Sequence, residues 1–175
     1  MKLGLLLVAS LLMGPLLTAQ AEPRTQEWNY TTLRSTPENL GSLAISVNAE
    51  VKTPDGKATL EVVPDYDRED MVWPSHLRYP GRTTLIRGGK GVAITFWIKG
   101  PAGSQISVRV TDAASTIFAE NQSYDLTGDW QKIEYKAELK VPITGRWVNA
   151  PRLLLEKTKK GEHYFVGPVT CQTIE

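Results

Sequence analysis

The sequence is poor in cysteine and histidine, which limits the chemistry that it can support. It contains one cysteine, Cys171, and two histidines in 175 residues. A single thiol cannot form a disulfide within the chain, and the Cys and His spacing of a zinc site is missing. We therefore expect a fold that is stabilised by its hydrophobic core, without a disulfide, a metal or another cofactor.

An excess of positive charge is also missing. One of the 20 Lys and Arg residues, Lys2, lies in the first 21 positions, so the remaining 154 residues carry 19 basic and 19 acidic side chains. Binding to the phosphate backbone of a nucleic acid requires a basic cluster, and none is visible along the chain. The sequence also has no basic amphipathic segment of the kind that binds a membrane surface, so we do not expect a membrane as the partner.

Long apolar stretches are confined to the N-terminus. Lys2 precedes an apolar stretch, 3–17, which is followed by small and polar residues up to Ala21. A membrane-spanning helix needs roughly 20 apolar residues, whereas this stretch is shorter and is interrupted by Gly14-Pro15. The pattern predicts a secretory signal peptide over residues 1–21, and hence a protein secreted to the periplasm or the extracellular space.

Most of the remaining chain alternates apolar with polar residues, as half-buried strands do. Two such stretches, 45–51 and 60–62, flank the turn sequence Pro54-Asp55-Gly56, which predicts a β-hairpin. Further candidate strands cover 92–98, 106–110, 116–124, 130–136, 153–155 and 164–166. The strongest core candidates are Ile94, Phe96, Ile98, Ile106, Val108 and Val110.

The pattern of elements predicts one all-β domain. No window of ten or more residues carries the apolar stripe of an amphipathic helix, and turn signals separate eight or nine short strands. Such a chain forms a β-sandwich or barrel. We assign the domain to residues 42–175, after a polar lead over 22–41.

Four segments, 126–132, 85–100, 73–77 and 164–169, resemble the jelly-roll carbohydrate-binding modules of the galactose-binding-like superfamily, the type appended to xylanases and glucanases. The most specific is Leu126-Thr127-Gly128-Asp129-Trp130-Gln131-Lys132, and the segment 85–100 resembles the glycine turn and strand of these modules. Weaker similarities cover 73–77 and 164–169. The resemblance implies a jelly-roll β-sandwich of two antiparallel sheets that binds a polysaccharide or glycan without cleaving it.

One departure from this family concerns calcium. Many of its modules hold a structural calcium ion with an aspartate of the closing strand, whereas this sequence has Gly167-Pro168 there. Calcium needs several converging oxygen ligands. We therefore expect no metal at this position.

Sugars are bound by aromatic rings that cover their apolar faces and by planar polar side chains that bind their hydroxyls. If Ile94, Phe96 and Ile98 face the core, Trp97 projects outward, and Arg109 projects similarly from the next strand. We predict both as ligand-binding residues. The alternative for Trp97 is that a loop covers it as a small satellite core.

Three more ligand-binding candidates, Trp73, His76 and Tyr79, lie in the stretch 64–81, which we predict to be an irregular excursion on one edge of the sheet with a short extended piece around 73–78. The alternative is that they only anchor this stretch. Trp130, by contrast, is expected to close one end of the sandwich as a core residue, as the resemblance also implies.

Three functions follow from these features. The first is non-catalytic glycan binding, and the second is an extracellular or envelope module that recognises a protein through the same fold. The third is a small glycoside hydrolase or lyase that uses the carboxylates between Asp65 and Asp70. Because a run of acids in a polar loop is usually solvated, we expect the protein not to be an enzyme.

Overall fold

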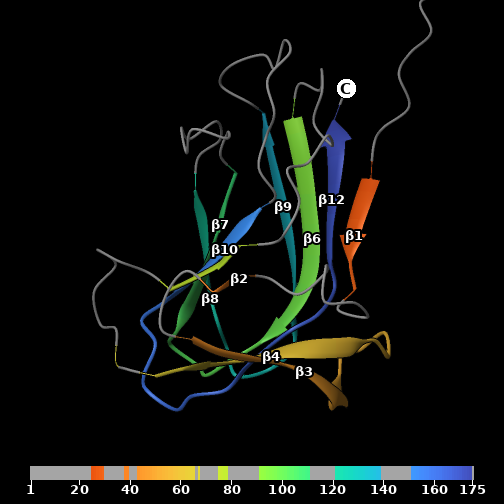
Figure 1. Ribbon diagram of the computed structural model, residues 1–175. Coiled ribbons are helices and arrows are strands. Elements are labelled where there is room, and N and C mark those ends of the chain that lie inside the picture. Colours follow the sequence, from red (N-terminus) through yellow and green to blue (C-terminus); the bar gives the residue numbers. More distant parts are fainter. Residues whose placement is uncertain are drawn as a thin grey trace, which may run out of the picture.

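A computed structural model shows two β-sheets packed face to face (Figure 1). It describes residues 25–29, 38–39, 43–65, 67, 75–78, 91–110, 121–138 and 151–174. In this part of the chain, no helix is long and apolar enough to cross a membrane. The predicted signal peptide lies outside the described residues and stays a prediction.

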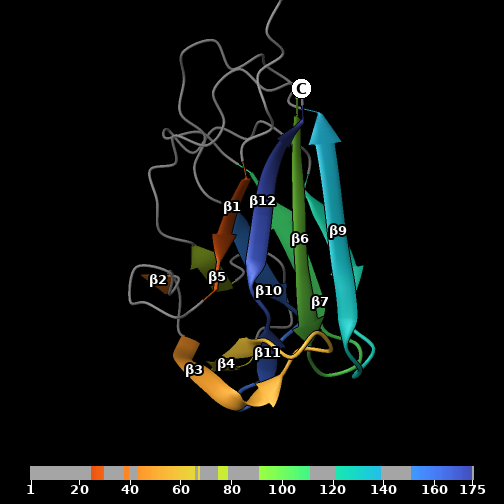
Figure 2. The ribbon, with the colours of Figure 1, turned by 90° about the vertical axis from the view of Figure 1, so that its right-hand side faces the viewer.

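The larger sheet, called sheet A below, has seven strands. They are β1 (Thr25–Trp28), β3 (Leu43–Lys52), β4 (Ala58–Pro64), β6 (Gly91–Lys99), β9 (Gln131–Glu138), β11 (Tyr164–Val166) and β12 (Val169–Ile174). Strand β6 pairs with β9 on one side and with both β12 and β11 on the other, and all these pairs are antiparallel. Figure 2 shows β1, β12, β6 and β9 side by side in this sheet.

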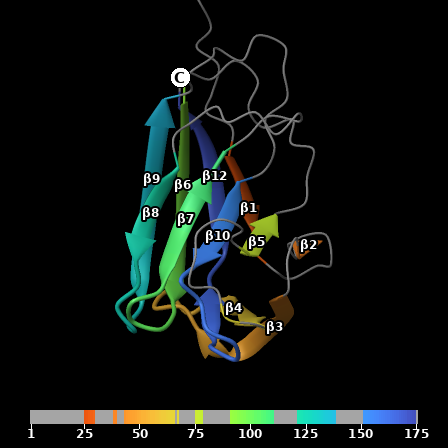
Figure 3. The same cartoon turned by 90° about the vertical axis from the view of Figure 1, so that its left-hand side faces the viewer.

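The smaller sheet, called sheet B, has five strands in the order β2, β5, β10, β7, β8. Their bounds are Glu38–Asn39 (β2), Ser75–Arg78 (β5), Gln105–Arg109 (β7), Gln122–Asp125 (β8) and Arg152–Glu156 (β10). Figure 3 views the molecule from the side of this sheet, with β8, β7, β10 and β5 in front. The predicted all-β sandwich of two antiparallel sheets is confirmed.

The predicted hairpin is formed by β3 and β4, and its turn shows why the sequence bends there. The Oγ1 atom of Thr53 accepts a hydrogen bond of 3.0 Å from the backbone N–H of Lys57 and donates one of 2.5 Å to Asp55. Gly56 adopts φ 81°, a conformation that a side chain disfavours. The turn is therefore specified by local side-chain chemistry.

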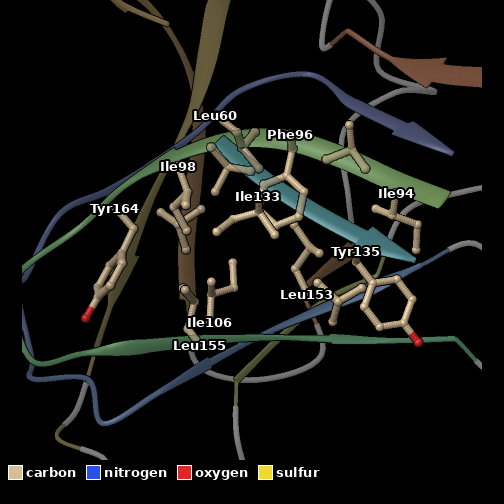
Figure 4. Close-up of a cluster of buried hydrophobic side chains, with 14 of the residues drawn as sticks. Leu60, Ile94, Phe96, Ile98, Ile106, Ile133, Tyr135, Leu153, Leu155 and Tyr164 are labelled. Atoms are coloured by element: carbon tan, nitrogen blue, oxygen red, sulfur yellow. The ribbon is translucent and has the colours of Figure 1, made fainter. Parts of the chain in front are cut away.

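The core lies between the two sheets. Sheet A contributes Ile94, Phe96 and Ile98, which face side chains of sheet B such as Ile106 and Leu155 (Figure 4). All six of the strongest core candidates from the sequence are buried. Complete burial of one such side chain stabilises a fold by about 1.5–3 kcal/mol.

The structure corrects three expectations. The lead, 22–41, supplies β1 to sheet A against β12 and β2 to sheet B against β5. Strand β5 is paired on both sides, with β2 and β10, so its part of the predicted excursion is not an edge. Trp130, which was expected in the core, is half-buried just before β9 and lies outside the buried cluster. A side chain at the end of a strand is buried only where another part of the chain packs over it.

Candidate functional site

The outer face of sheet B, the side that turns away from the core, is mostly polar. Since Ile106 and Val108 of β7 and Leu153 and Leu155 of β10 point into the core, the residues between them point outward. These outward residues of β7, β10 and the adjoining chain of β8 are Gln105, Ser107, Arg109, Arg152, Leu154, Glu156, Asn121, Ser123 and Asp125. Eight of these nine are polar, which is the composition of a surface that exchanges hydrogen bonds.

Strand register arranges these residues in rows across the sheet, and the middle row is closed to solvent. Leu154 pairs with Ser107 on one side and with His76 on the other, and Ser107 pairs with Ser123. The two serine hydroxyls are hydrogen-bonded at 2.6 Å. Ser107 and Leu154 are each only 1% exposed, although they lie on the outer face.

A second row lies at the C-terminal end of β10 and contains two carboxylates. The Nε2 atom of Gln105 donates a 2.5 Å hydrogen bond to Asp125, and Gln105 is the register partner of Glu156. Glu156 is 4% exposed, and its Oε2 atom has no hydrogen-bond partner within the described part of the chain. A buried acceptor of this kind costs free energy until a donor reaches it.

The third row contains Arg109. Arg109 pairs with Arg152 in register, both side chains are half-buried, and the Nε atom of Arg109 donates a 3.2 Å hydrogen bond to Asn121. His76 is the register partner of Leu154 in β5. Two of the five predicted ligand-binding residues, Arg109 and His76, thus lie on the two strands that flank β10. Trp73 and Tyr79 lie outside the described residues.

Trp97 lies on the opposite side of the molecule, on the outer face of sheet A. Its register partner is Lys132, and its carbonyl oxygen accepts a 2.8 Å hydrogen bond from the N–H of Gly167. The side chain is half-buried. The structure therefore separates Trp97 from Arg109, because β6 and β7 belong to different sheets.

A polar cluster that the sequence did not indicate lies elsewhere on sheet A. The Nδ1 atom of His163 lies 2.7 Å from Oε1 of Glu61, and Nδ2 of Asn48 donates a 3.0 Å hydrogen bond to Oε2 of the same carboxylate. The hydrogen bond to His163, and next the one from Asn48, lowers the pKa of Glu61 below its ordinary value of 4.5. No sequence motif surrounds these residues, which are far apart along the chain.

The acidic stretch offers no catalytic pair among the described residues. Asp65 and Asp67 are both exposed, and Oδ1 of Asp67 accepts a 2.8 Å hydrogen bond from the N–H of Lys160. Glu69 and Asp70 lie outside the described part. Within that part, no group of three or more His, Cys, Asp or Glu side chains could hold a metal ion.

No family model and no curated protein matches the sequence. By structure, the chain is similar to the CBM22-1 xylan-binding domain of Xyn10C from Paenibacillus barcinonensis, with a TM-score of 0.54 and 16% identity over 86% of this chain and 93% of that domain. The chain has the fold of a carbohydrate-binding module.

Two further structures support this similarity. The CBM6cm-2 module of lichenase 5A from Cellvibrio mixtus, solved in complex with cellotriose, has a TM-score of 0.51 and 11% identity over 80% of this chain and 92% of the module. The α-L-arabinofuranosidase MgGH51 has a TM-score of 0.59 and 11% identity over 87% of this chain, but the match covers 24% of that enzyme. The two modules are matched over nearly their whole length, whereas the enzyme is matched in part.

Proposed function

We propose that this protein is an exported, non-catalytic carbohydrate-binding protein that engages a polysaccharide or glycan. The observation that carries the proposal is the outer face of sheet B, where Gln105, Arg109 and Asn121 present planar polar groups. Saccharide hydroxyls, which both donate and accept, are bound by such groups in pairs. The shared fold with carbohydrate-binding modules supports the same function.

Trp73 and Tyr79 stay sequence-based candidates for the aromatic rings of such a site; in the sequence they lie on either side of β5. Stacked rings would cover the apolar faces of the sugars.

Trp97 marks a second candidate surface, on the outer face of sheet A. It is half-buried there, with polar neighbours such as Lys132. A protein partner is favoured less, because Val47, at 49% exposed, is the sole exposed large apolar side chain within the described ranges. An apolar docking patch would need several such side chains together.

The test is binding of residues 22–175 to a glycan array and to insoluble polysaccharides, with Arg109→Ala and Trp97→Ala compared in parallel. We expect saturable binding of one glycan class with a Kd of roughly micromolar to millimolar, as for one short stretch of sugar. Loss of glycan binding with Arg109→Ala alone would support sheet B as the site, whereas loss of glycan binding with Trp97→Ala alone would indicate that the site lies on sheet A. No binding to any glycan would refute the proposed function.

A further inference from the structure

The carboxylate of Glu61, on the outer face of sheet A, is held in place from one side by an asparagine. The pairing of β3 with β4 shifts register between Asn48 and Lys52. At this irregular point, Oδ1 of Asn48 accepts hydrogen bonds of 2.9 and 2.8 Å from the N–H groups of the residues two and three positions later. The Nδ2 atom of Asn48 donates to Oε2 of Glu61. The amide is therefore fixed, and it fixes one oxygen of the carboxylate.

A histidine and an aromatic ring adjoin the other oxygen of this carboxylate. The Nδ1 atom of His163 lies 2.7 Å from Oε1 of Glu61. The imidazole stacks on Phe165, with ring centroids 6.5 Å apart and an angle of 21° between the planes. The side chain of His163 is 58% exposed, and that of Glu61 is 22% exposed. Since an ionised carboxylate accepts about four hydrogen bonds, Glu61 keeps room for a ligand that donates.

Strand register places Phe165 in the middle of a row that crosses four strands. Phe165 is the partner of Lys99 in β6 on one side and of Glu61 in β4 on the other. Glu61 is in turn the partner of Ser46 in β3. The residues that flank Phe165 and Glu61 along their strands belong to the core, so the row faces outward. A cation, a ring, a carboxylate and a hydroxyl thus follow one another over about 14 Å, at about 4.8 Å per strand.

A second large aromatic residue lies beside this row, which we call the Phe165 row. Trp97 precedes Lys99 by two positions and belongs to the same face of β6, so it is a diagonal neighbour of Phe165. Such neighbours have Cα atoms about 7–8 Å apart. Both aromatic side chains are half-buried and lie outside the buried core cluster. Their rings therefore belong to the outer surface of the molecule.

The charges of the Phe165 row balance one another. Lys99 and Glu61 carry opposite charges on the two sides of Phe165. The next cation of the same face, Lys132, is paired with Glu134 at 2.7 Å. Neither an anion nor a cation is favoured by such a row, whereas a neutral ligand that both donates and accepts hydrogen bonds matches it.

We propose that the Phe165 row is a second saccharide-binding site, where a neutral sugar ring stacks on Phe165 and its hydroxyls bind Glu61 and Lys99. The inference rests on the proposed glycan-binding function and adds a site to it. A sugar ring has an apolar face that an aromatic ring can cover, and hydroxyls at its rim that donate to a carboxylate and accept from an ammonium group. Because the outer faces of the two sheets point away from each other, the two sites hold separate polysaccharide chains.

The two histidines of the chain lie in different sheets, which allows the second site to be observed directly. His76 is in β5 of sheet B, and His163 directly precedes β11 of sheet A. Imidazole NMR signals are recorded while residues 22–175 are titrated with xylohexaose, with cellohexaose and with a hexasaccharide of each neutral polysaccharide that binds. His76→Gln assigns the signals. We expect the His163 signal to shift to saturation, with a Kd of roughly micromolar to millimolar.

Variants of the Phe165 row identify the contacts that cause this shift. Phe165→Leu keeps an apolar side chain but removes the flat ring, and it should raise the Kd read from His163 about tenfold, whereas Phe165→Tyr should preserve it. Glu61→Gln should also raise this Kd. Its control, Glu134→Gln, changes the net charge equally at an exposed position of β9 and should leave the Kd unchanged. Thermal unfolding of each variant verifies the fold.

The outcomes separate the second site from the proposed function. Saturable glycan binding that leaves the His163 signal in place would overturn the second site and leave glycan binding intact. The same conclusion would follow if Phe165→Leu did not change the Kd, or if Glu61→Gln and Glu134→Gln raised it equally. Failure of every polysaccharide to bind would refute glycan binding itself, and the second site with it.

Discussion

Gly167, in the connection between β11 and β12, has no room for a side chain. A Cβ atom added there would lie 2.5 Å from Cγ2 of Thr53 and 3.3 Å from Cβ of Trp97. Thr53 belongs to the turn between β3 and β4 and is buried, so this turn folds over the outer face of the sheet beside Trp97. The lack of a side chain at Gly167 is what allows this close approach.

We expect Gly167→Ala to lower the free energy of unfolding by about 1–3 kcal/mol, the usual cost of overpacking. Thr53→Ser deletes the methyl group in the way and keeps the hydroxyl that orders the turn, so the double variant should recover part of this loss. Denaturant unfolding of the single and double variants measures both effects. Additive losses in the double variant would show that Thr53 is not the obstacle.

Strand β12 is the element that joins the two ends of the domain. It pairs with β1 on one side and with β6 on the other, so a strand from the N-terminal lead covers the last strand. Cys171 lies in β12, opposite Gln26 of β1, and its side chain is buried in the core. Burial raises the pKa of its thiol to about 12, which leaves almost no thiolate at neutral pH.

Removal of residues 22–29 should therefore do two things. It turns β12 into an edge strand, which lowers the melting temperature and favours self-association. It also speeds the reaction of Cys171 with a thiol reagent, which in the complete domain should occur only after unfolding by guanidinium. Unchanged labelling rate and melting temperature in the shortened chain would show that β1 contributes little to the sheet.

At the scale of the whole molecule, the two sheets share one core and neither can bury its apolar face alone. Phe96 of sheet A is 1% exposed, and Ile106 and Leu155 of sheet B are fully buried against the same cluster. Because the described residues contain one cysteine and no disulfide, this packing is the main source of stability. Such a domain unfolds cooperatively.

Phe96→Ala should lower the free energy of unfolding by about 3–5 kcal/mol, since it leaves a cavity between the sheets. We expect one transition, at the same denaturant concentration by tryptophan fluorescence and by circular dichroism. Lys136→Gln, at an exposed position, should change the stability by less than about 0.5 kcal/mol. Two separated transitions would show that the sheets unfold independently.

The sequence alone determined the main strands of the core and the side of each that is buried. The alternation in 92–98 and 106–110 is local and has a period of two, so it identified the buried residues correctly. The turn at Pro54-Asp55-Gly56 was predictable because turn residues are also a local signal in the sequence. Strands β1 and β2 were missed because four and two residues are too few to show a period.

Only the tertiary structure decided which strands share a sheet, and with that the candidate site. Trp97 and Arg109 both point away from the core, yet they lie on opposite faces, because the chain crosses from sheet A to sheet B between them. The Phe165 row was not visible in the sequence either, since Lys99, Phe165 and Glu61 become neighbours only through strand register. The periodicity of a strand records which side is buried, and it carries no information on which distant strand lies beside it.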